Sequence, residues 1–300
     1  MHEAGETAAA TRGDAGELIE DELTLRSADG TPLHVRRVRP AGGARARLLC
    51  VHGFAEHGGR YGHVLRFFAA RGYEAAVLDL RGHGRSGGRR TYVRRFDDYL
   101  DDLSAYWRQL GEGTPRLPLL ALAHSMGGLV LLRTLQARGD LFPGLLGAAA
   151  SSPFLAIGTR LPAWKVVMGK GLSRVWPAFR LPSDLDTGHL SRDPAVGAAY
   201  LADPLVVKSA TSRWFTEVLA AQQAVFADAA RVRVPLLLQH GSDDRLVDPA
   251  ATERLAGLLR GPCALRVWPS LRHELMNEPE REEVLGHLLG WFEERLGSAS

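Results

Sequence analysis

The chain has 300 residues, of which 45% are hydrophobic and 24% are charged, and this is the composition of an ordinary globular protein. A chain of this length can form one large α/β domain with an insertion, or two small domains. No stretch reaches the roughly 20 apolar residues that a membrane-spanning helix requires, because Ser151, Ser152 and Pro153 interrupt the run at 145–157. The composition therefore excludes a disordered tail protein, a collagen-like fibre and a membrane bundle.

Arginine carries almost all the positive charge, because the chain has only three lysines at a formal net charge of +3. The arginines are scattered, with Asp and Glu between them, whereas a nucleic-acid-binding protein gathers its basic residues on one face. We therefore expect no nucleic-acid partner. The two cysteines, Cys50 and Cys263, both lie in apolar runs. They predict small buried hydrophobic residues rather than a disulfide framework, which favours a reducing, cytoplasmic location.

Residues 1–18 are rich in Ala, Gly and Glu and show no periodicity, so a disordered tail is predicted there. The tail has several acidic residues and no apolar segment, so we do not interpret it as a signal peptide. Beyond it, Leu23 and Leu25 alternate with polar residues before an Asp-Gly pair at 29–30, and Leu33 resumes the pattern. This arrangement predicts a β-hairpin.

Short apolar runs then alternate with stretches of helical periodicity. Each run is apolar on both faces, which is typical of strands in a buried parallel sheet. The runs lie at residues 47–51, 75–80, 117–123, 144–150, 235–239 and 264–268. The helices are expected at residues 61–70, 96–110, 126–136, 249–259 and 280–296. The alternation predicts the α/β class, with a mostly parallel, eight-stranded, doubly wound sheet that begins with the antiparallel hairpin.

The stretch 153–232 interrupts this alternation, because it contains helical pieces broken by Pro and Gly and no strand candidate of comparable strength. It holds three of the six tryptophans, Trp164, Trp176 and Trp214. A loop of this length without structure of its own is uncommon in a compact domain. We therefore predict an inserted helical cap at 153–232, and a core domain built from 19–152 and 233–300.

The strongest local motif is LLALAHSMGG at residues 119–128, where an apolar strand runs directly into an amphipathic helix. It is a variant of the G-x-S-x-G nucleophile elbow around Ser125, with Ala123 in the place of the first glycine. Small residues are required there because the turn is tight, and the start of the helix offers backbone N–H groups to a developing oxyanion. The alternative is that Ser125 only caps the helix.

A serine nucleophile needs a base and an acid that orients the base, and on this fold the order along the chain is serine, acid, histidine. The sequence HGSDDRLVD follows the run at 235–239, and PSLRHE follows the next run. The base is therefore His273. Asp243, Asp244 and Asp248 are candidates for the acid, of which Asp248 precedes a proline and predicts a helix cap. We favour Asp244 over Asp243.

A second oxyanion donor is expected from the loop HGFAEHGGRY, which follows the run at 47–51. The candidate donors are the backbone N–H groups of Phe54 and Met126. His52 and His57 in this loop lack the accompanying carboxylate or cysteine ligands of a metal site, so no metal is predicted. We expect these two histidines, and His124, to have structural roles.

The segment DLRGHGRSGG at 79–88 lacks the Gly-Lys-Ser/Thr ending of a nucleotide-binding loop and does not match the dinucleotide fingerprint. We interpret it as a turn that leaves a strand, with Asp79 and Arg81 paired structurally. No cofactor is implied.

The segments HGFAEHGGRY, DLRGHGRSGG, AHSMGG, GSDDRLVD and RHELMNEPE follow one another along the chain. In this order they resemble the α/β-hydrolase fold serine hydrolases, and more narrowly the monoacylglycerol lipase and lysophospholipase branch, also termed serine aminopeptidase-like. The resemblance implies that the catalytic triad and the oxyanion donors fall on Ser125, Asp244, His273, Phe54 and Met126. Two departures are Ala123, which replaces the usual glycine, and the bulky Phe54, whose ring is expected to narrow the acyl side of the pocket.

In this family the insertion is a lid that binds the acyl chain, so the resemblance implies an apolar inner surface on the cap. Its candidate residues are Leu161, Trp164, Val166, Val167, Met168, Leu172, Val175, Trp176 and Phe179. Packing within an ordinary helical core is the alternative for these side chains. An arginine-containing amphipathic lid could also touch a membrane surface transiently.

The predicted function is hydrolysis of carboxylic esters with an apolar acyl chain, of the monoacylglycerol or lysophospholipid kind. Alternatives on the same scaffold are an aminopeptidase or amidase, a small-ester carboxylesterase, and a ligand receptor without activity. An acidic patch in the cap would favour the aminopeptidase, and its candidate residues are Asp184, Asp186, Asp193 and Asp203. Haloalkane dehalogenases and epoxide hydrolases are disfavoured because they use an aspartate nucleophile at the elbow. The sequence assigns no oligomeric state.

Overall fold

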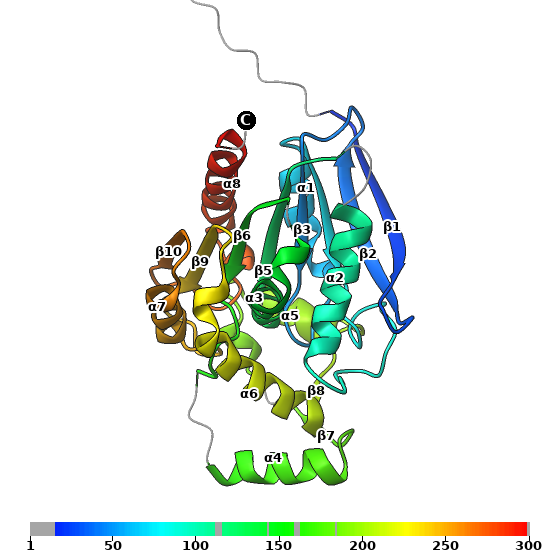
Figure 1. Cartoon of the computed structure of the whole chain (residues 1–300), viewed down its shortest axis with the longest axis vertical. Coiled ribbons are helices and arrows are strands. Elements are labelled where there is room, and N and C mark those ends of the chain that lie inside the picture. Colours follow the sequence, from blue (N-terminus) through cyan, green and yellow to red (C-terminus); the bar gives the residue numbers. More distant parts are fainter. Residues whose placement is uncertain (1–15, 112–115, 143, 159–162, 184, 299–300) are drawn as a thin grey trace, which may run out of the picture.

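A computed structural model describes residues 16–111, 116–142, 144–158, 163–183 and 185–298. Its centre is an eight-stranded sheet in the order β1-β2-β4-β3-β5-β6-β9-β10 (Figure 1). The hairpin strands β1 and β2 pair antiparallel, and β2 joins β4 antiparallel, while the other strand pairs are parallel. The strands are β1 Leu18–Arg26, β2 Pro32–Pro40, β3 Ala46–Val51, β4 Tyr73–Leu78, β5 Leu119–His124, β6 Leu145–Ser151, β9 Leu236–Gly241 and β10 Cys263–Trp268. The predicted fold class is confirmed, although the predicted tail lies outside the described residues as far as residue 15.

Helices cover both faces of the sheet, because each central strand sends alternate side chains to opposite sides. In β5, Leu119, Ala121 and Ala123 join one apolar cluster, whereas Leu120 and Leu122 join the other. The first cluster also holds side chains of α2 Asp97–Gly111, α3 Met126–Arg138 and α7 Pro249–Leu258. The second holds side chains of α1 Gly62–Ala69 and α8 Arg281–Gly297. These helices match the sequence predictions closely, and the Asp248 side chain caps α7, as expected, by accepting from the backbone N–H of Ala250 at 3.0 Å.

The segment between β6 and β9, called the cap below, contains α4 Ala163–Val175, α5 Pro194–Ala202 and α6 Ser212–Ala227. It also contains a two-stranded sheet of β7 Arg180–Pro182 and β8 Ser209–Thr211, which the sequence did not predict because three residues are too few to show a strand period. Helix α6 lies between the core and α4 in Figure 1. Since Trp214, Val218 and Val225 of α6 belong to the first apolar cluster, the cap and the core share one hydrophobic interior.

In the turn at 79–88, the predicted pairing of Asp79 with Arg81 is wrong. Asp79 does not pair with Arg81; its carboxylate accepts the backbone N–H groups of Gly58 at 2.6 Å and Arg85 at 2.8 Å. The Arg81 guanidinium instead donates to Asp102 on α2 at 2.6 and 2.7 Å. A buried carboxylate is satisfied as well by loop N–H groups as by a cation, and sequence proximity does not distinguish the two.

The two cysteines differ in exposure, which corrects part of the prediction. Cys50 lies in the central strand β3 and is buried, whereas Cys263 is exposed. Cys263 begins β10, which is an edge strand of the sheet and is therefore covered on fewer sides. No helix in the described part of the chain is long and apolar enough to cross a lipid bilayer.

Candidate active site

Ser125 occupies a strained turn between β5 and α3. Its backbone has φ 50° and ψ −117°, and a non-glycine residue with positive φ is uncommon and concentrates at functional sites. The turn is held by its backbone, since Ser125 N–H donates to the Ser151 carbonyl at 3.0 Å and the Ser125 carbonyl accepts from Phe154 N–H at 2.9 Å. The side chain makes no capping hydrogen bond to α3. The helix-cap alternative is therefore wrong, and the hydroxyl is left for another role.

The residues on either side of Ser125 show why the turn needs small side chains. A Cβ atom at Gly127 would lie 2.4 Å from the carbonyl oxygen of His52 and 2.6 Å from that of Val51. No such conflict arises at Ala123, whose methyl group is buried in the first apolar cluster. The alanine variant of the motif is thus accommodated, whereas any side chain at Gly127, two residues after the serine, would overlap backbone carbonyl groups.

His273 and Asp244 form a buried pair on the loops that follow β10 and β9. His273 Nδ1 lies 2.7 Å from Asp244 Oδ2, and Asp244 Oδ1 accepts the N–H groups of Leu246 at 2.9 Å and Val247 at 3.0 Å. Burial alone would lower the pKa of His273, but the charge and the hydrogen bond of Asp244 outweigh it and raise the pKa. Asp243 is half-buried, and its carboxylate lies 3.5 Å from Arg245 and 4.0 Å from Arg272 rather than against His273, so the geometry selects Asp244 as the partner of the histidine.

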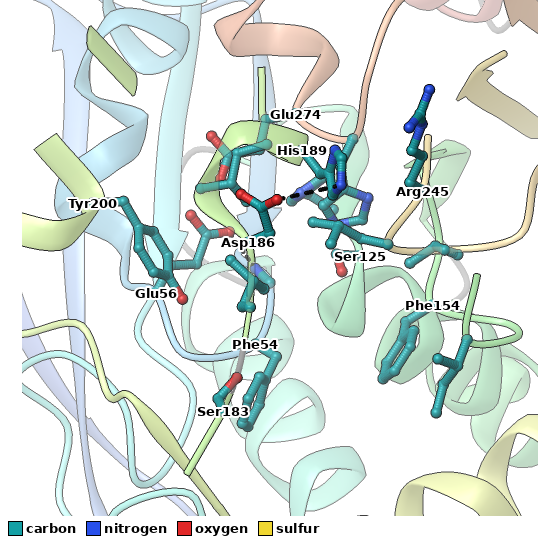
Figure 2. A pocket seen from close by; sticks show the side chains of 18 of the residues that line it. Phe54, Glu56, Ser125, Phe154, Ser183, Asp186, His189, Tyr200, Arg245 and Glu274 are labelled. Atoms are coloured by element: carbon teal, nitrogen blue, oxygen red, sulfur yellow. Dashed lines mark hydrogen bonds and ion pairs between the residues drawn. The ribbon is translucent and has the colours of Figure 1, made fainter. Parts of the chain in front are cut away.

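A cavity of about 500 Å³ opens onto Ser125 and His273 (Figure 2). One part of its wall is apolar, formed by Phe54, Phe154, Ile157, Leu185, Leu190, Ala210, Trp214, Leu246 and Val247. Another part is polar, formed by Glu56, Arg60, Ser183, Asp186, His189, Arg245 and Glu274. The site thus combines a hydroxyl, an imidazole and a partly apolar chamber, which is the composition of a small-molecule binding site.

The backbone N–H groups of Phe54 and Met126 have no hydrogen-bond acceptor among the described residues. The Phe54 ring stacks on the Trp214 indole of α6, with ring centroids 3.9 Å apart. The Trp214 Nε1–H in turn donates to Met126 Sδ at 3.3 Å. A single cap side chain therefore contacts both residues whose N–H groups were predicted as oxyanion donors, and the Phe54 ring forms part of the apolar wall.

Glu56 holds the loop that carries Phe54. Its buried carboxylate accepts Gly53 N–H at 2.6 Å, the Tyr61 hydroxyl at 2.8 Å and Arg60 Nη1 at 2.6 Å. Burial opposes ionisation, but the charge of Arg60 prevails and lowers the pKa of Glu56 to about 2. Arg60 also donates to both carboxylate oxygens of Glu274 at 2.8 Å. The loop of Phe54 is therefore joined through Glu56, Arg60 and Glu274 to the residue that follows His273. Glu56 and Arg60 belong to the motif HGFAEHGGRY, but the sequence did not show that they contact Glu274.

The profile of the family described as serine aminopeptidase, S33, matches residues 42–280. The chain belongs to this family. A monoacylglycerol lipase of Mycolicibacterium smegmatis is 35% identical over 251 residues, which are 83% of this chain and 88% of that protein. A phospholipase of Bacillus subtilis is 32% identical over 80% of this chain and 92% of its own length.

The family member also matches solved structures over nearly its whole length. The crystal structure of a monoacylglycerol lipase from Paleococcus ferrophilus has a TM-score of 0.77 and 26% identity, and covers 93% of this chain and 99% of that one. The family resemblance inferred from the motifs is confirmed. The protein is a monoacylglycerol lipase-like α/β hydrolase.

The three histidines expected to have structural roles, His52, His57 and His124, each form a hydrogen bond within the protein. His52 Nδ1 donates to the Gly53 carbonyl at 2.7 Å, and its Nε2 accepts from Leu80 N–H at 3.0 Å. His57 Nε2 lies 2.8 Å from Asp203 Oδ2 of the cap. Burial lowers the pKa of His124 to about 4, and its ring lies 4.7 Å from that of His273. Across the residues that the structure describes, no three His, Cys, Asp or Glu side chains gather to hold a metal ion.

The cap residues expected to bind the acyl chain lie elsewhere. Trp164, Val167, Met168 and Trp176 are exposed, Leu172 and Phe179 are half-buried, and none is among the described residues of the cavity wall. Leu161 lies outside the described residues. The reason is that α4 packs its other side on α6, as in the contact of Ser173 with Thr216 at 2.8 Å. Helical periodicity shows that a face is apolar, but it does not show what covers that face.

We expect Gly127→Ala to destabilise the fold by about 1–3 kcal/mol, because the new methyl group would overlap two carbonyl oxygens. Urea unfolding measures this loss. Gly286→Ala in α8 is the matched control, since a Cβ there meets nothing within 4 Å, and it should be neutral or stabilise by up to about 1 kcal/mol. Equal stability of the two variants would contradict the close approach at the elbow.

Proposed function

We propose that this protein hydrolyses carboxylic esters with an apolar acyl chain through a triad of Ser125, His273 and Asp244. The observation that carries the proposal is the cavity of about 500 Å³, whose apolar wall opens onto Ser125 and His273. The relatives support it, since those named above are a monoacylglycerol lipase and a phospholipase. A lipid-like ester is accordingly the proposed substrate.

In the proposed reaction, His273 Nε2 takes the hydroxyl proton of Ser125 as the oxygen attacks the ester carbonyl. Asp244 keeps the proton on Nδ1 and stabilises the imidazolium, and the Phe54 and Met126 N–H groups stabilise the oxyanion. His273 then returns its proton to the leaving alcohol, which leaves an acyl group on Ser125. A water molecule, activated by the same imidazole, releases the fatty acid.

The charged residues of the cavity favour an uncharged headgroup. Arg60 is bonded to both Glu56 and Glu274, so its charge is already balanced. The Arg245 side chain is 65% exposed, lies 3.5 Å from Asp243, and points away from Ser125 in Figure 2. Each arginine of the described wall therefore has a carboxylate beside it, and neither is free to bind a phosphate. The two buried glutamates would also repel a phosphate group of the substrate. We infer that a monoacylglycerol is preferred to a lysophospholipid.

The aminopeptidase alternative depends on a patch of acidic residues in the cap, but the described ones lie at separate places with different partners. Asp186 lines the cavity, 3.5 Å from His189. Asp193 caps α5, and Asp203 contacts His57. Asp184 lies outside the described residues. Asp186 is the one described member of this set that lines the cavity, and one cap carboxylate is a weaker site for a substrate amine than the patch that would favour this activity. We therefore keep the ester as the proposed substrate.

We expect the protein to hydrolyse p-nitrophenyl esters of medium and long chains, because each CH₂ group of the acyl chain that is buried in the cavity strengthens binding by about 0.8 kcal/mol. Ser125→Ala should lower kcat by at least about 10⁴-fold. The measurement is the hydrolysis rate over a chain-length series from acetate to palmitate. A second comparison sets the hydrolysis of monooleoylglycerol beside that of the lysophosphatidate with the same oleoyl chain.

Each other outcome of this series identifies an alternative. Activity on acetate alone would indicate a small-ester carboxylesterase, and cleavage of an amino-acyl amide with no ester turnover would indicate the amidase. No turnover and no labelling by a fluorophosphonate would indicate a ligand receptor.

The pH dependence of kcat/KM should reflect the environment of His273. The neutral imidazole is the active form, so activity is lost as the pH falls through its pKa. Because Asp244 raises that pKa against the opposing effect of burial, we expect the acidic limb to lie above the ordinary histidine value of 6.5. Asp244→Asn should lower kcat by about 10⁴-fold and move the limb to lower pH. An unmoved limb would exclude Asp244 as the charged partner.

We further propose that the outer face of α4 contacts a lipid surface. Trp164 and Val167 of α4 are 61% and 70% exposed, and Trp176, which directly follows the helix, is 60% exposed. Lys170 and Arg174 of α4 are exposed as well. Helix α4 lies at the end of the cap farthest from the sheet (Figure 1). An exposed apolar face with cations beside it is the pattern of a reversible interfacial helix.

Trp164→Ser combined with Trp176→Ser should weaken binding to anionic vesicles at least about tenfold, because two interfacial indoles are lost, with little change on a soluble short-chain ester. Vesicle co-sedimentation measures the binding. The matched control replaces two exposed leucines outside the cap, Leu141 and Leu258, with serine. Equal binding by both double variants would contradict a contact through α4.

A further inference from the structure

A second buried imidazole contacts the carboxylate of Asp244. His240 lies in β9 without solvent exposure, and its Nε2 is 2.9 Å from Asp244 Oδ2. This is the oxygen that also lies 2.7 Å from His273 Nδ1. The other oxygen, Oδ1, accepts the N–H groups of Leu246 and Val247. Each oxygen of the carboxylate thus has two partners, which is about the full acceptor capacity of the group.

The hydrogen bonds of His240 determine where its proton lies. An ionised carboxylate only accepts hydrogen bonds, so Nε2 of His240 carries a hydrogen toward Asp244. Nδ1 of His240 lies 2.7 Å from Oγ1 of Thr252 on α7, which is fully buried. This hydrogen bond to Thr252 holds the side of the ring opposite Asp244. A chain of hydrogen bonds therefore runs from Thr252 through His240 to Asp244, where it meets the N–H of His273.

We propose that His240 is a positioning residue of the catalytic acid, which aims Asp244 Oδ2 at His273 Nδ1 and draws part of the negative charge from that oxygen. The inference rests on the proposed roles of Asp244 and His273. Without the second donor, Oδ2 would concentrate its charge on His273 and hold the imidazolium more tightly. A donor on the acid thus keeps the base able to release its proton to the leaving group.

Other charged and titratable groups also face this pair. The His124 ring lies 4.7 Å from that of His273, and the charges of Glu274 and Glu56 act on His273 in the same direction as Asp244. None of them contacts His240, whose described polar partners are Asp244 and Thr252. Substitution of His240 therefore changes one partner of the carboxylate and leaves the rest of the surroundings in place.

The test compares His240→Leu, which removes the donor, with His240→Gln, whose amide N–H reaches the same oxygen. We expect His240→Leu to move the acidic limb of kcat/KM up by about half a pH unit and to lower kcat on the order of tenfold, with KM nearly unchanged. His240→Gln should restore the limb and most of kcat. Steady-state kinetics across pH on a p-nitrophenyl ester gives all three quantities, and thermal unfolding confirms that each variant is folded.

Thr252→Val is the second variant, because it removes only the hydroxyl that orients His240. It should move the limb in the same direction by a smaller amount, and it keeps the test valid if His240→Leu does not fold. An unmoved limb in both variants, or equal losses in the Leu and Gln variants, would overturn the positioning role. Full activity of Ser125→Ala would instead overturn the proposed function, so the two failures are distinguishable.

Discussion

The close approach of β5, α3 and the loop after β3 at Ser125 is the constraint on which the site depends. Gly127 leaves room for the carbonyl of His52, and the backbone of Ser125 takes a positive φ so that the strand can turn directly into the helix. The same contact sets two positions. It places the hydroxyl beyond the carboxyl end of the sheet, and it holds the loop that begins at His52 against the start of α3.

Buried charges then fix the loops around that contact. Arg60 joins Glu56 on the loop of Phe54 to Glu274 beside His273, and Asp244 is surrounded by donors from β9 and the loops after β9 and β10. Buried charges are tolerated only when they are paired and hydrogen-bonded. Because these networks restrict the loops to few conformations, the imidazole and the loop N–H groups are in position before a substrate binds.

The cap is divided between two tasks. Its inner helix α6 shares the core of the sheet and supplies Trp214, which contacts the residues on both sides of the predicted oxyanion hole. Its outer helix α4 packs on α6, and Trp164 of this helix and Trp176 directly after it are exposed to the solvent. One helix thus shapes the cavity, and the other offers an apolar surface outside it. Anchoring to the core explains how an insertion between β6 and β9 can reach the oxyanion loop.

The eight strands, the core helices and the candidates Ser125 and His273 could be predicted from the sequence, because period-two and period-3.6 patterns, the elbow motif and the order of the triad residues can be recognised along the chain. The sequence favoured Asp244 over Asp243, and the 2.7 Å contact with His273 is what separates the two. The partners of side chains that are distant in sequence depend on the tertiary structure. Asp79 binds loop N–H groups rather than Arg81, Trp164 of α4 and the adjacent Trp176 are exposed, and His240 joins Asp244 from within a strand. These pairings depend on how separate elements meet in space, and the apolar pattern of one element does not encode that.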